Sequence, residues 1–279
     1  TSLVSDNRNW GAAFFFNHSE REWYDDNGDD YSELPKLENT SFGTNLFYTP
    51  NKNQKLEISL SHLNEYRYGG EMVEIPAEFT QQSEERLTKV WMGSVDHQIN
   101  FNDDHSSLIG YVAGQKTKRT HYTGIFPDQE QQIQAHLDDP PYGTSEVATY
   151  QGGLQLNHKA NGLIAGTNTI TLGTEYVYDD VFDEISSYNY LIDQTTRDFG
   201  AFLQSDWKIS PAFTLLSGVR SDKNNLIDHL VFNPRASLLY KLKTNMQFRL
   251  SYGTGFRAPQ AFDTDLHIAF AGGGISRVS

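Results

Sequence analysis

The 279-residue sequence contains no cysteine, which excludes a disulfide framework, a thiolate metal site and a cysteine nucleophile. Basic residues are scarce as well. The sequence has 22 Lys and Arg and 36 Asp and Glu, which gives a formal net charge of −14. Binding to nucleic acid depends on a basic face that neutralises phosphates. The charge balance therefore argues against a nucleic-acid partner.

Long apolar runs are also missing, since none approaches the about 20 residues that a transmembrane helix needs. The mean hydropathy is −0.57. This value does not exclude a membrane protein, because a transmembrane β-barrel turns only every second residue toward lipid and has the average hydropathy of a soluble chain. Proline is sparse, at 9 residues, whereas aromatic residues are abundant, with 17 Phe, 15 Tyr and 4 Trp. Such a composition leaves room for many strands.

Alternation of apolar and polar residues predicts about eleven β-strands. In one of them, Leu56, Ile58 and Leu60 alternate with polar residues. The predicted strands cover 10–18, 41–49, 55–70, 86–101, 107–120, 147–159, 169–179, 197–209, 213–221, 231–242 and 246–253. Many are longer than the about 5–6 residues of a globular strand and suit the roughly 9–11 residues of a tilted transmembrane strand. No helical pattern intervenes between strands, so a parallel α/β sheet is not expected.

The predicted connections alternate between short and long. Short turns are expected at 50–54, 102–106, 210–213 and 243–245, and long loops at 19–39, 70–84, 121–146 and 180–196. Outer-membrane barrels have short periplasmic turns and long extracellular loops. Aromatic residues beside the short turns would form the inner interface girdle; they are Phe47, Tyr48, Phe101, Trp207, Phe213 and Tyr240. Strand length and loop asymmetry thus favour an antiparallel transmembrane β-barrel.

A distinctive string follows the last predicted strand. After 246-MQFRLSYG-253 the chain reads TGFRAPQAFDTDL, which resembles the motif "GxGFRAPxxxDxD(L/F)" of TonB-dependent outer-membrane receptors. The matching residues are Gly255, Phe256, Arg257, Ala258, Pro259, Asp263, Asp265 and Leu266. The string 65-EYRYGG-70 is similar to one that opens an extracellular loop in the same family. In the motif turn we expect Arg257 to pair with Asp263 or Asp265.

The resemblance implies a plugged barrel of 22 strands, of which residues 1–279 would form a partial barrel domain without the plug and the C-terminal strands. It implies a multi-pass location in the bacterial outer membrane, in contact with outer-membrane lipid. It also implies a receptor that imports a scarce metal chelate (a ferric siderophore, cobalamin or haem). Transport would be energised by the TonB complex acting through the absent plug, and a surface lipoprotein is a further possible partner. The resemblance implies no enzymatic activity.

The acidic stretch 25-DDNGDDYSE-33 is the candidate metal site. Asp25, Asn27 and Asp29 have the alternate spacing by which a turning loop presents oxygen atoms to Ca²⁺, and Glu33 adds a carboxylate. Asp30 stands where an EF-hand requires Gly, so the loop is not an EF-hand. Some cobalamin receptors of the family order acidic extracellular loops around calcium, which adds support by resemblance. The alternative is a solvated acidic loop.

Substrate contact is expected on the long loops 121–146 and 180–196. The candidate stacking groups there are Tyr122, Phe126, Tyr142 and Tyr188. Asp103, Asp104, His105 and Ser106 share one turn, but adjacent turn residues do not generally reach the geometry of a catalytic triad. We therefore expect no catalytic residues.

Two other classes of protein fit the alternation of apolar and polar residues. A passive outer-membrane porin would let small solutes diffuse without an energy source. A soluble β-sandwich that binds a ligand would bury its apolar face and need no detergent.

Overall fold

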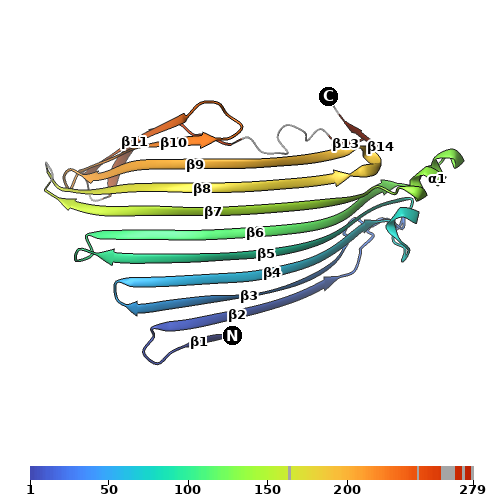
Figure 1. Ribbon diagram of the computed structural model, residues 1–279, viewed down its shortest axis with the longest axis horizontal. Helices are drawn as coiled ribbons and strands as arrows, with labels where there is room; N and C mark the ends of the chain where they lie inside the picture. The colour runs from blue at the N-terminus through green and yellow to red at the C-terminus, as the bar shows by residue number, and fades with distance from the viewer. Residues whose placement is uncertain (163–164, 244, 259–267, 272–273, 278–279) are drawn as a thin grey trace.

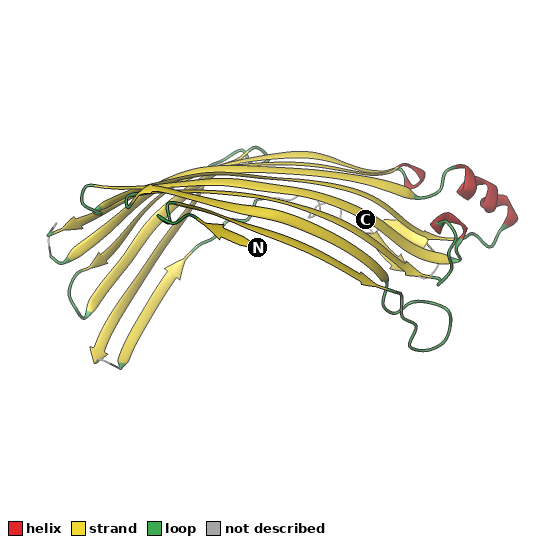
Figure 2. Cartoon of the chain, turned by 90° about the horizontal axis from the view of Figure 1, so that it is seen from below, coloured by secondary structure: helices red, strands yellow, loops and turns green. Residues whose placement is uncertain are grey.

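The computed structural model describes residues 1–162, 165–243, 245–258, 268–271 and 274–277. Twelve antiparallel strands form one sheet in sequence order, and a separate hairpin pairs β13 (Ile268–Ala271) with β14 (Gly274–Arg277). The twelve strands are β1 (Ser2–Val4), β2 (Trp10–Arg21), β3 (Lys36–Asn51), β4 (Gln54–Gly70), β5 (Gln82–Phe101), β6 (Ser106–Ile125), β7 (Tyr142–Asn161), β8 (Thr167–Ile185), β9 (Tyr190–Lys208), β10 (Phe213–Asn224), β11 (Val231–Lys243) and β12 (Met246–Gly253). The sheet is curved into an open trough, as Figures 1 and 2 show.

The antiparallel all-β fold predicted from the sequence is confirmed. All eleven predicted strands are present, and the sheet gains β1, whose three residues are too few to show a periodicity. Each strand from β2 to β11 pairs with its sequence neighbour on both sides, although β2 pairs with β1 only over residues 11–13 and β9 pairs with β10 only over residues 198–208. Strands β1 and β12 are the two edges of the sheet.

The connections divide between the two ends of the sheet, as Figure 1 shows. At one end, on the left of the figure, short turns join the strands, such as residues 52–53 and 102–105. At the other end lie the longer loops 22–35, 71–81 and 126–141. The predicted alternation of short and long connections is therefore correct for these segments.

The loop predicted at 180–196 is wrong. Strand β8 continues to Ile185 and β9 begins at Tyr190, and only the 3-10 helix η2 (Ser186–Tyr188) lies between them. One of the acidic residues that suggested a loop, Asp180, is bonded across the two strands, because the Thr195 hydroxyl donates to its carboxylate at 2.8 Å. Charged side chains are compatible with a strand wherever its face meets water.

Helices were not expected, yet the structure has helices at the long-loop end. Loop 126–141 contains α1 (Glu130–Asp138), and η1 (Ala77–Phe79) lies in loop 71–81. In the described part of the chain, no helix is long and apolar enough to cross a membrane.

One face of the sheet, here called the apolar face, carries a continuous apolar band next to the short turns. Residues directly opposite on paired strands share a face, so the register assigns every strand position to one face. The row Leu56, His97, Gly110 and Leu154 lies on the apolar face, as does the row Ile58, Val95 and Val112. Val112 and Leu154 are each 59% exposed. An exposed apolar surface of this extent marks contact with lipid or with another protein.

The opposite face, here called the polar face, carries the hydrophilic residues of the same strands. The alternation in the sequence predicts ten polar residues on one face, and the register confirms that all ten lie on the polar face. They are Gln151, Gln155, Asn157, Glu175, Gln204, Asp206, Lys208, Arg235, Gln247 and Arg249. Phe47 is a correction to the predicted girdle, because it lies opposite Glu57 on the polar face. Its ring occupies the space where a Cβ on Gly11 would lie.

If the apolar face meets hydrocarbon, as the resemblance implies, a charge at the middle of the band must be costly. We expect Leu154→Arg to lower the free energy of unfolding by about 2–4 kcal/mol. The neighbouring change Gln155→Arg, on the polar face, should have little effect. Urea unfolding of the full-length protein in lipid vesicles measures both. Equal losses for the two variants would show that the apolar face is not the lipid-facing one.

Candidate functional site

A cavity of about 870 Å³ lies at the long-loop end of the polar face. Its wall is formed by the ends of β4, β5 and β6, and loop 22–35, α1 and η2 complete it. The charged and aromatic side chains that line it are Tyr31, Glu33, Arg67, Glu84, His136 and Tyr188. The volume falls in the range of a small-molecule site, and its lining combines both signs of charge with aromatic rings.

A row of basic side chains crosses the polar face at the edge of this cavity. Arg67 of β4 lies directly opposite Arg86 of β5, which lies directly opposite His121 of β6. Arg119 is on the same face of β6, one side-chain position nearer the middle of the strand. Glu84 forms an ion pair with Arg86. The four side chains are here called the basic row. Its three arginines concentrate positive charge in a chain that is acidic as a whole, whereas burial, with Arg119 and Arg86 nearby, lowers the pKa of His121 and favours its neutral form.

Two members of the basic row carry polar atoms without a protein partner. The Nε atom of Arg119 and the Nδ1 atom of His121 are buried and have no hydrogen-bond partner among the described residues. The same holds for a carboxylate oxygen of Asp183, which lies on the same face of β8. Buried polar atoms without partners cost free energy, and native structures retain them mainly where water, an ion or a ligand supplies the bond.

The structure brings the four predicted stacking residues together but gives them different environments. Tyr188 lines the cavity and is 40% exposed, with its hydroxyl 3.4 Å from the Thr123 carbonyl oxygen. Tyr122 is fully buried at 0% exposure. Its ring contacts Tyr142, with centroids 5.1 Å apart, on the apolar side of the strands. Phe126 packs edge-on against His136 of α1, at 5.6 Å. Of these four residues, only Tyr188 lines the cavity.

Tyr142 and His136 hold α1 and η1 against the strands. The Tyr142 hydroxyl donates to the Glu78 carboxylate at 2.6 Å, and the His136 Nε2 atom lies 3.0 Å from the Glu78 carbonyl oxygen. Glu78 belongs to η1, so one residue links both helices to β7. Burial raises the pKa of the Tyr188 hydroxyl, which therefore stays protonated at neutral pH. The contacts through Glu78 therefore fix α1 and η1 beside the cavity.

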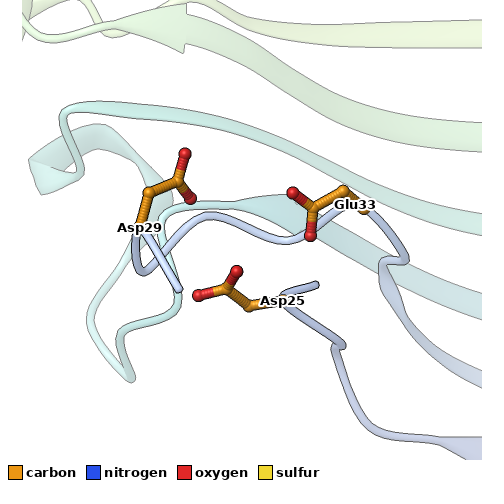
Figure 3. A group of neighbouring side chains, drawn as sticks. All are labelled: Asp25, Asp29 and Glu33. Atoms are coloured by element: carbon orange, nitrogen blue, oxygen red, sulfur yellow. The ribbon is translucent and has the colours of Figure 1, made fainter. Parts of the chain in front are cut away.

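The acidic loop brings three carboxylates together. One ligand oxygen from each of Asp25, Asp29 and Glu33 lies within 4.8 Å of the other two, and Figure 3 shows the three side chains converging from different parts of the loop. Asp30, the remaining acidic candidate, is not a member of this group, and the predicted role of Asn27 stays a prediction. The exposed acidic triad has the composition to bind a metal ion, because hard cations prefer carboxylate oxygens.

The loop holds its shape through its own side chains. The Asp25 carboxylate accepts hydrogen bonds from the backbone N–H groups of Asn27, Gly28 and Asp30, at 3.1, 2.6 and 2.9 Å. The Glu33 carboxylate accepts from the N–H of Asp26 at 2.7 Å. The Gly28 N–H bond is the main reason that the pKa of Asp25 lies below its ordinary value.

Backbone bonds anchor the acidic loop to the neighbouring loop 71–81. The N–H of Met72 donates to the Asp30 carbonyl oxygen at 2.9 Å, and the N–H of Ser32 donates to the Gly70 carbonyl oxygen at 2.9 Å. Gly70 has a φ of +115°, and a Cβ at this position would lie 2.3 Å from the Gln82 carbonyl oxygen. The two glycines that end 65-EYRYGG-70 thus allow a close approach of β4, β5 and loop 22–35.

The described part of the distinctive C-terminal string lies against the polar face. Gly255, Phe256 and Ala258 line a second cavity, of about 530 Å³, together with residues of β8 to β11. An ion-paired network borders it, in which Arg220 contacts Glu175 at 3.3 Å and Asp222 at 2.7 Å. Pro259, Asp263, Asp265 and Leu266 lie outside the described residues. The predicted pairing of Arg257 stays a prediction.

The sequence interpretation missed the basic row and the role of α1. Arg67 was noticed only within a motif, and the other three members lie on two further strands, β5 and β6, without a linear pattern. What the four side chains share is that they lie on the same face of the sheet. This becomes visible only when the pairing register of the strands is known. The turn at Asp103, Asp104 and His105 lies at the opposite end from the cavity, and the two aspartates have positive φ values of 51° and 64°.

Comparison with known proteins identifies a family for this arrangement. The model of the family described as TonB dependent receptor-like, beta-barrel matches residues 2–274. No curated protein matches the sequence.

Solved structures show the same fold. The siderophore receptor PirA from Pseudomonas aeruginosa has a TM-score of 0.68 at 12% identity, covering 93% of this chain and 39% of that one. The ferric enterobactin receptor PfeA from the same organism, solved as a double mutant, has a TM-score of 0.68 at 15% identity, over 93% and 40%. The alcaligin outer-membrane receptor FauA from Bordetella pertussis has a TM-score of 0.66 at 13% identity, over 90% and 39%. The chain thus spans about two fifths of the length of these receptors.

The contacts of the acidic loop predict a graded effect of mutation. Asp25→Ala removes the acceptor of three backbone N–H groups, whereas Asn27→Ala removes the acceptor of one, the N–H of Asp29 at 2.9 Å. We expect proteolytic cleavage within 22–35 to accelerate strongly in the first variant of the full-length protein and weakly in the second.

The same loop should respond to acid. Because the folded pKa of Asp25 is lowered, its contribution to loop order is complete above the ordinary carboxyl pKa and is lost as pH falls through the folded value. Limited proteolysis with an acid-active protease at several pH values follows this change. If Asp25→Ala and Asn27→Ala were cleaved at the same rate, this would contradict the conclusion that the Asp25 carboxylate holds the loop in shape.

Proposed function

Since this chain belongs to the TonB dependent receptor-like β-barrel family, whose members are outer-membrane receptors, we propose that it forms part of the wall of a receptor that imports a scarce metal chelate. The observation that carries the proposal is the basic row beside the cavity of about 870 Å³ at the long-loop end. Outer-membrane barrels place their longer loops outside the cell, so this cavity would meet substrate first.

We propose that the substrate is an anionic chelate, with a ferric siderophore favoured over cobalamin or haem. Arginine side chains bind carboxylate and phenolate oxygens with several donors at once, and the basic row supplies three of them. The buried Arg119 Nε atom would gain an acceptor, and the His121 Nδ1 atom a hydrogen-bond partner, when such a ligand or its water shell enters. Tyr188, and Phe126 to a lesser extent, would pack against the apolar part of the chelate, whereas Tyr122 and Tyr142 would support the wall.

Other parts of the receptor follow from the same proposal. The rest of a 22-stranded barrel would pair with the edges β1 and β12, because an open sheet edge is not stable in hydrocarbon. A plug domain would lie against the polar face and carry the segment that engages the TonB complex. A surface lipoprotein could cover the long-loop end. No covalent chemistry is required, since binding followed by gating performs the transport.

The basic row provides the test of substrate class. We expect Arg67→Ala with Arg86→Ala to weaken binding of anionic ferric chelates to the purified full-length receptor by tenfold or more, because a hydrogen bond to a charged group contributes about 1.5–3 kcal/mol. Binding of neutral ferric hydroxamates should change little. Quenching of intrinsic fluorescence measures both affinities, and uptake of radioactive iron by cells measures transport.

Matched variants separate charge from fold. Lys52→Ala with Lys159→Ala removes the same charge near the short turns and should leave binding intact. Tyr188→Ala should weaken every chelate with an aromatic or apolar body, whereas Tyr122→Ala should lower stability instead, since its ring is buried. Equal losses for anionic and neutral chelates in the arginine variant would remove the proposed selectivity.

We propose further that the acidic triad binds Ca²⁺. Asp25, Asp29 and Glu33 supply three carboxylates, and carbonyl groups and water would complete the 6–8 oxygen ligands that calcium takes. The loop borders the cavity through Glu33, so a bound ion would stiffen its rim.

Calorimetric titration of the receptor with calcium chloride tests this assignment. Asp25→Asn with Glu33→Gln should weaken calcium binding at least tenfold, because two of the three charged ligands are neutralised. The control Asp103→Asn with Asp104→Asn neutralises an acidic pair in the turn at the opposite end and should have no effect. Calcium binding that survives the first pair of substitutions would place the ion elsewhere.

A further inference from the structure

The three arginines of the basic row differ in the carboxylates that surround them. Arg67 is exposed and, in the described part of the chain, has no carboxylate within ion-pair distance. Arg86 is paired with Glu84, two positions along the same strand. Arg119 shares its row across the sheet with Asp183 of β8. One arginine is therefore free to meet an anion, and two have a carboxylate of the protein beside them.

Arg119 and Asp183 face each other across a small residue. Arg119 of β6 lies directly opposite Ser145 of β7, and Ser145 lies directly opposite Asp183 of β8. Ser145 is buried, and its short side chain leaves room for a long one to extend above it. The positive charge of Arg119 attracts the Asp183 carboxylate. The two side chains thus form a charge pair that spans three strands of the polar face.

The other neighbours of Asp183 on this face are uncharged and apolar. Val181 and Ile185 flank it along β8, and Ile192 of β9 lies directly opposite. Ile185 and Ile192 are both buried. A carboxylate among such side chains costs free energy unless a partner offsets the loss of water. Charged groups retained in surroundings of this kind are concentrated at functional sites.

The pairing of Arg119 with Asp183 is incomplete. The Nε atom of Arg119 and one carboxylate oxygen of Asp183 have no hydrogen-bond partner among the described residues. An arginine and a carboxylate pair most strongly through two parallel N–H···O bonds, which these free atoms leave unmade. Arg119 is therefore attracted by Asp183 without being saturated by it, and its guanidinium keeps the capacity to bind a further anion.

Glu84 stands in the same relation to Arg86 at the cavity itself. Glu84 lines the cavity, and the side chains of the ion pair are about half exposed. An ion pair in contact with water contributes little to stability, so an entering anion can replace the Glu84 carboxylate on Arg86. The negative charge of Glu84 nevertheless stays beside the ligand and repels it.

We propose that Asp183 and Glu84 set an upper limit to the affinity of the basic row for anionic chelates. This inference rests on the proposed function. Each chelate exchanges partners with a carboxylate of the protein, and that carboxylate then repels the bound anion by Coulomb's law. A neutral chelate feels no such repulsion. The limit serves import, because a receptor has to release the chelate that it has captured.

Replacing Asp183 should make the receptor bind more tightly. We expect Asp183→Asn to raise the affinity of the purified full-length receptor for a trianionic ferric tris-catecholate about tenfold, mainly through slower release. Glu84→Gln should raise it less, since an exposed charge is screened by water and salt. Quenching of intrinsic fluorescence gives the affinity, and displacement by excess unlabelled chelate gives the release rate.

Two controls show that the effect is one of charge at this place. Glu184→Gln removes the adjacent carboxylate of β8, which is exposed on the apolar face, and should leave binding unchanged. A neutral ferric tris-hydroxamate should bind Asp183→Asn as it binds the unmodified receptor. Misfolding cannot imitate a gain of affinity. An affinity of Asp183→Asn for the tris-catecholate equal to or below that of the unmodified receptor would overturn the limit. The proposed function would stand, because it depends on the arginine variants.

A measurement without any chelate tests the pairing by itself. Phenylglyoxal attacks the deprotonated guanidinium group, which a neighbouring carboxylate disfavours, and mass spectrometry of peptides counts the modified arginines. We expect Arg119 to react severalfold faster in Asp183→Asn than in the unmodified receptor, with the rate at Arg67 unchanged. An equal rate at Arg119 in both proteins would show that Asp183 does not hold it, and would overturn the inference even if the arginines bind anionic chelates.

Discussion

The structure depends on one constraint, the unbroken hydrogen-bond ladder that joins twelve neighbouring strands. Inside hydrocarbon no water is present to bond an unpaired N–H or C=O group, and each such group costs several kcal/mol. Strands β4 to β8 meet this requirement on both sides along nearly their whole length. The two edges do not, which is why the family closes its sheets into barrels. Everything else in the fold, from strand length to loop asymmetry, follows from satisfying the ladder across a bilayer.

The ladder also fixes the register, and the register assembles the site. A slip of one residue would turn every side chain of a strand to the opposite face, so the long apolar band holds each strand in place. Arg67, Arg86 and His121 are far apart in the sequence, yet the pairing of β4, β5 and β6 sets them side by side beside the cavity. By fixing the register, the apolar band therefore determines which side chains lie beside the cavity on the other face.

Local periodicity predicted most of the fold, because each strand is long enough to show alternation by itself. It located eleven of the strands and the short turns, and the alternate positions predicted the polar face. It did not predict β1, whose three residues carry no periodicity, or the continuation of β8 and β9 through an acidic stretch. The acidic residues there suggested a loop because composition alone does not say where a strand leaves the membrane.

The candidate site was less accessible from the sequence, for a physical reason. The acidic triad lies within nine residues, so spacing alone brought Asp25, Asp29 and Glu33 together as a candidate. The basic row depends on pairing between strands, and the burial of Tyr122 depends on contacts with η1 and α1. Such relations are properties of the assembled sheet.

Each long strand passes from hydrocarbon into a more polar region, and the chemistry of its side chains changes along a single face. On β6 this face presents Val112 to hydrocarbon, Lys116 and Lys118 to the headgroup level, and Tyr122 to a packed aromatic cluster above it. These residues are at alternate positions of one strand and all point to the same face, so backbone geometry does not cause the change in side-chain chemistry. The surroundings select the side chains: apolar where no water is present, charged where the face leaves the apolar band, and aromatic where α1 and η1 cover the strand ends. The extension of the strands beyond the apolar band is thus what gives the receptor a rigid platform for its loops, and it is what allows a barrel wall to carry a binding site.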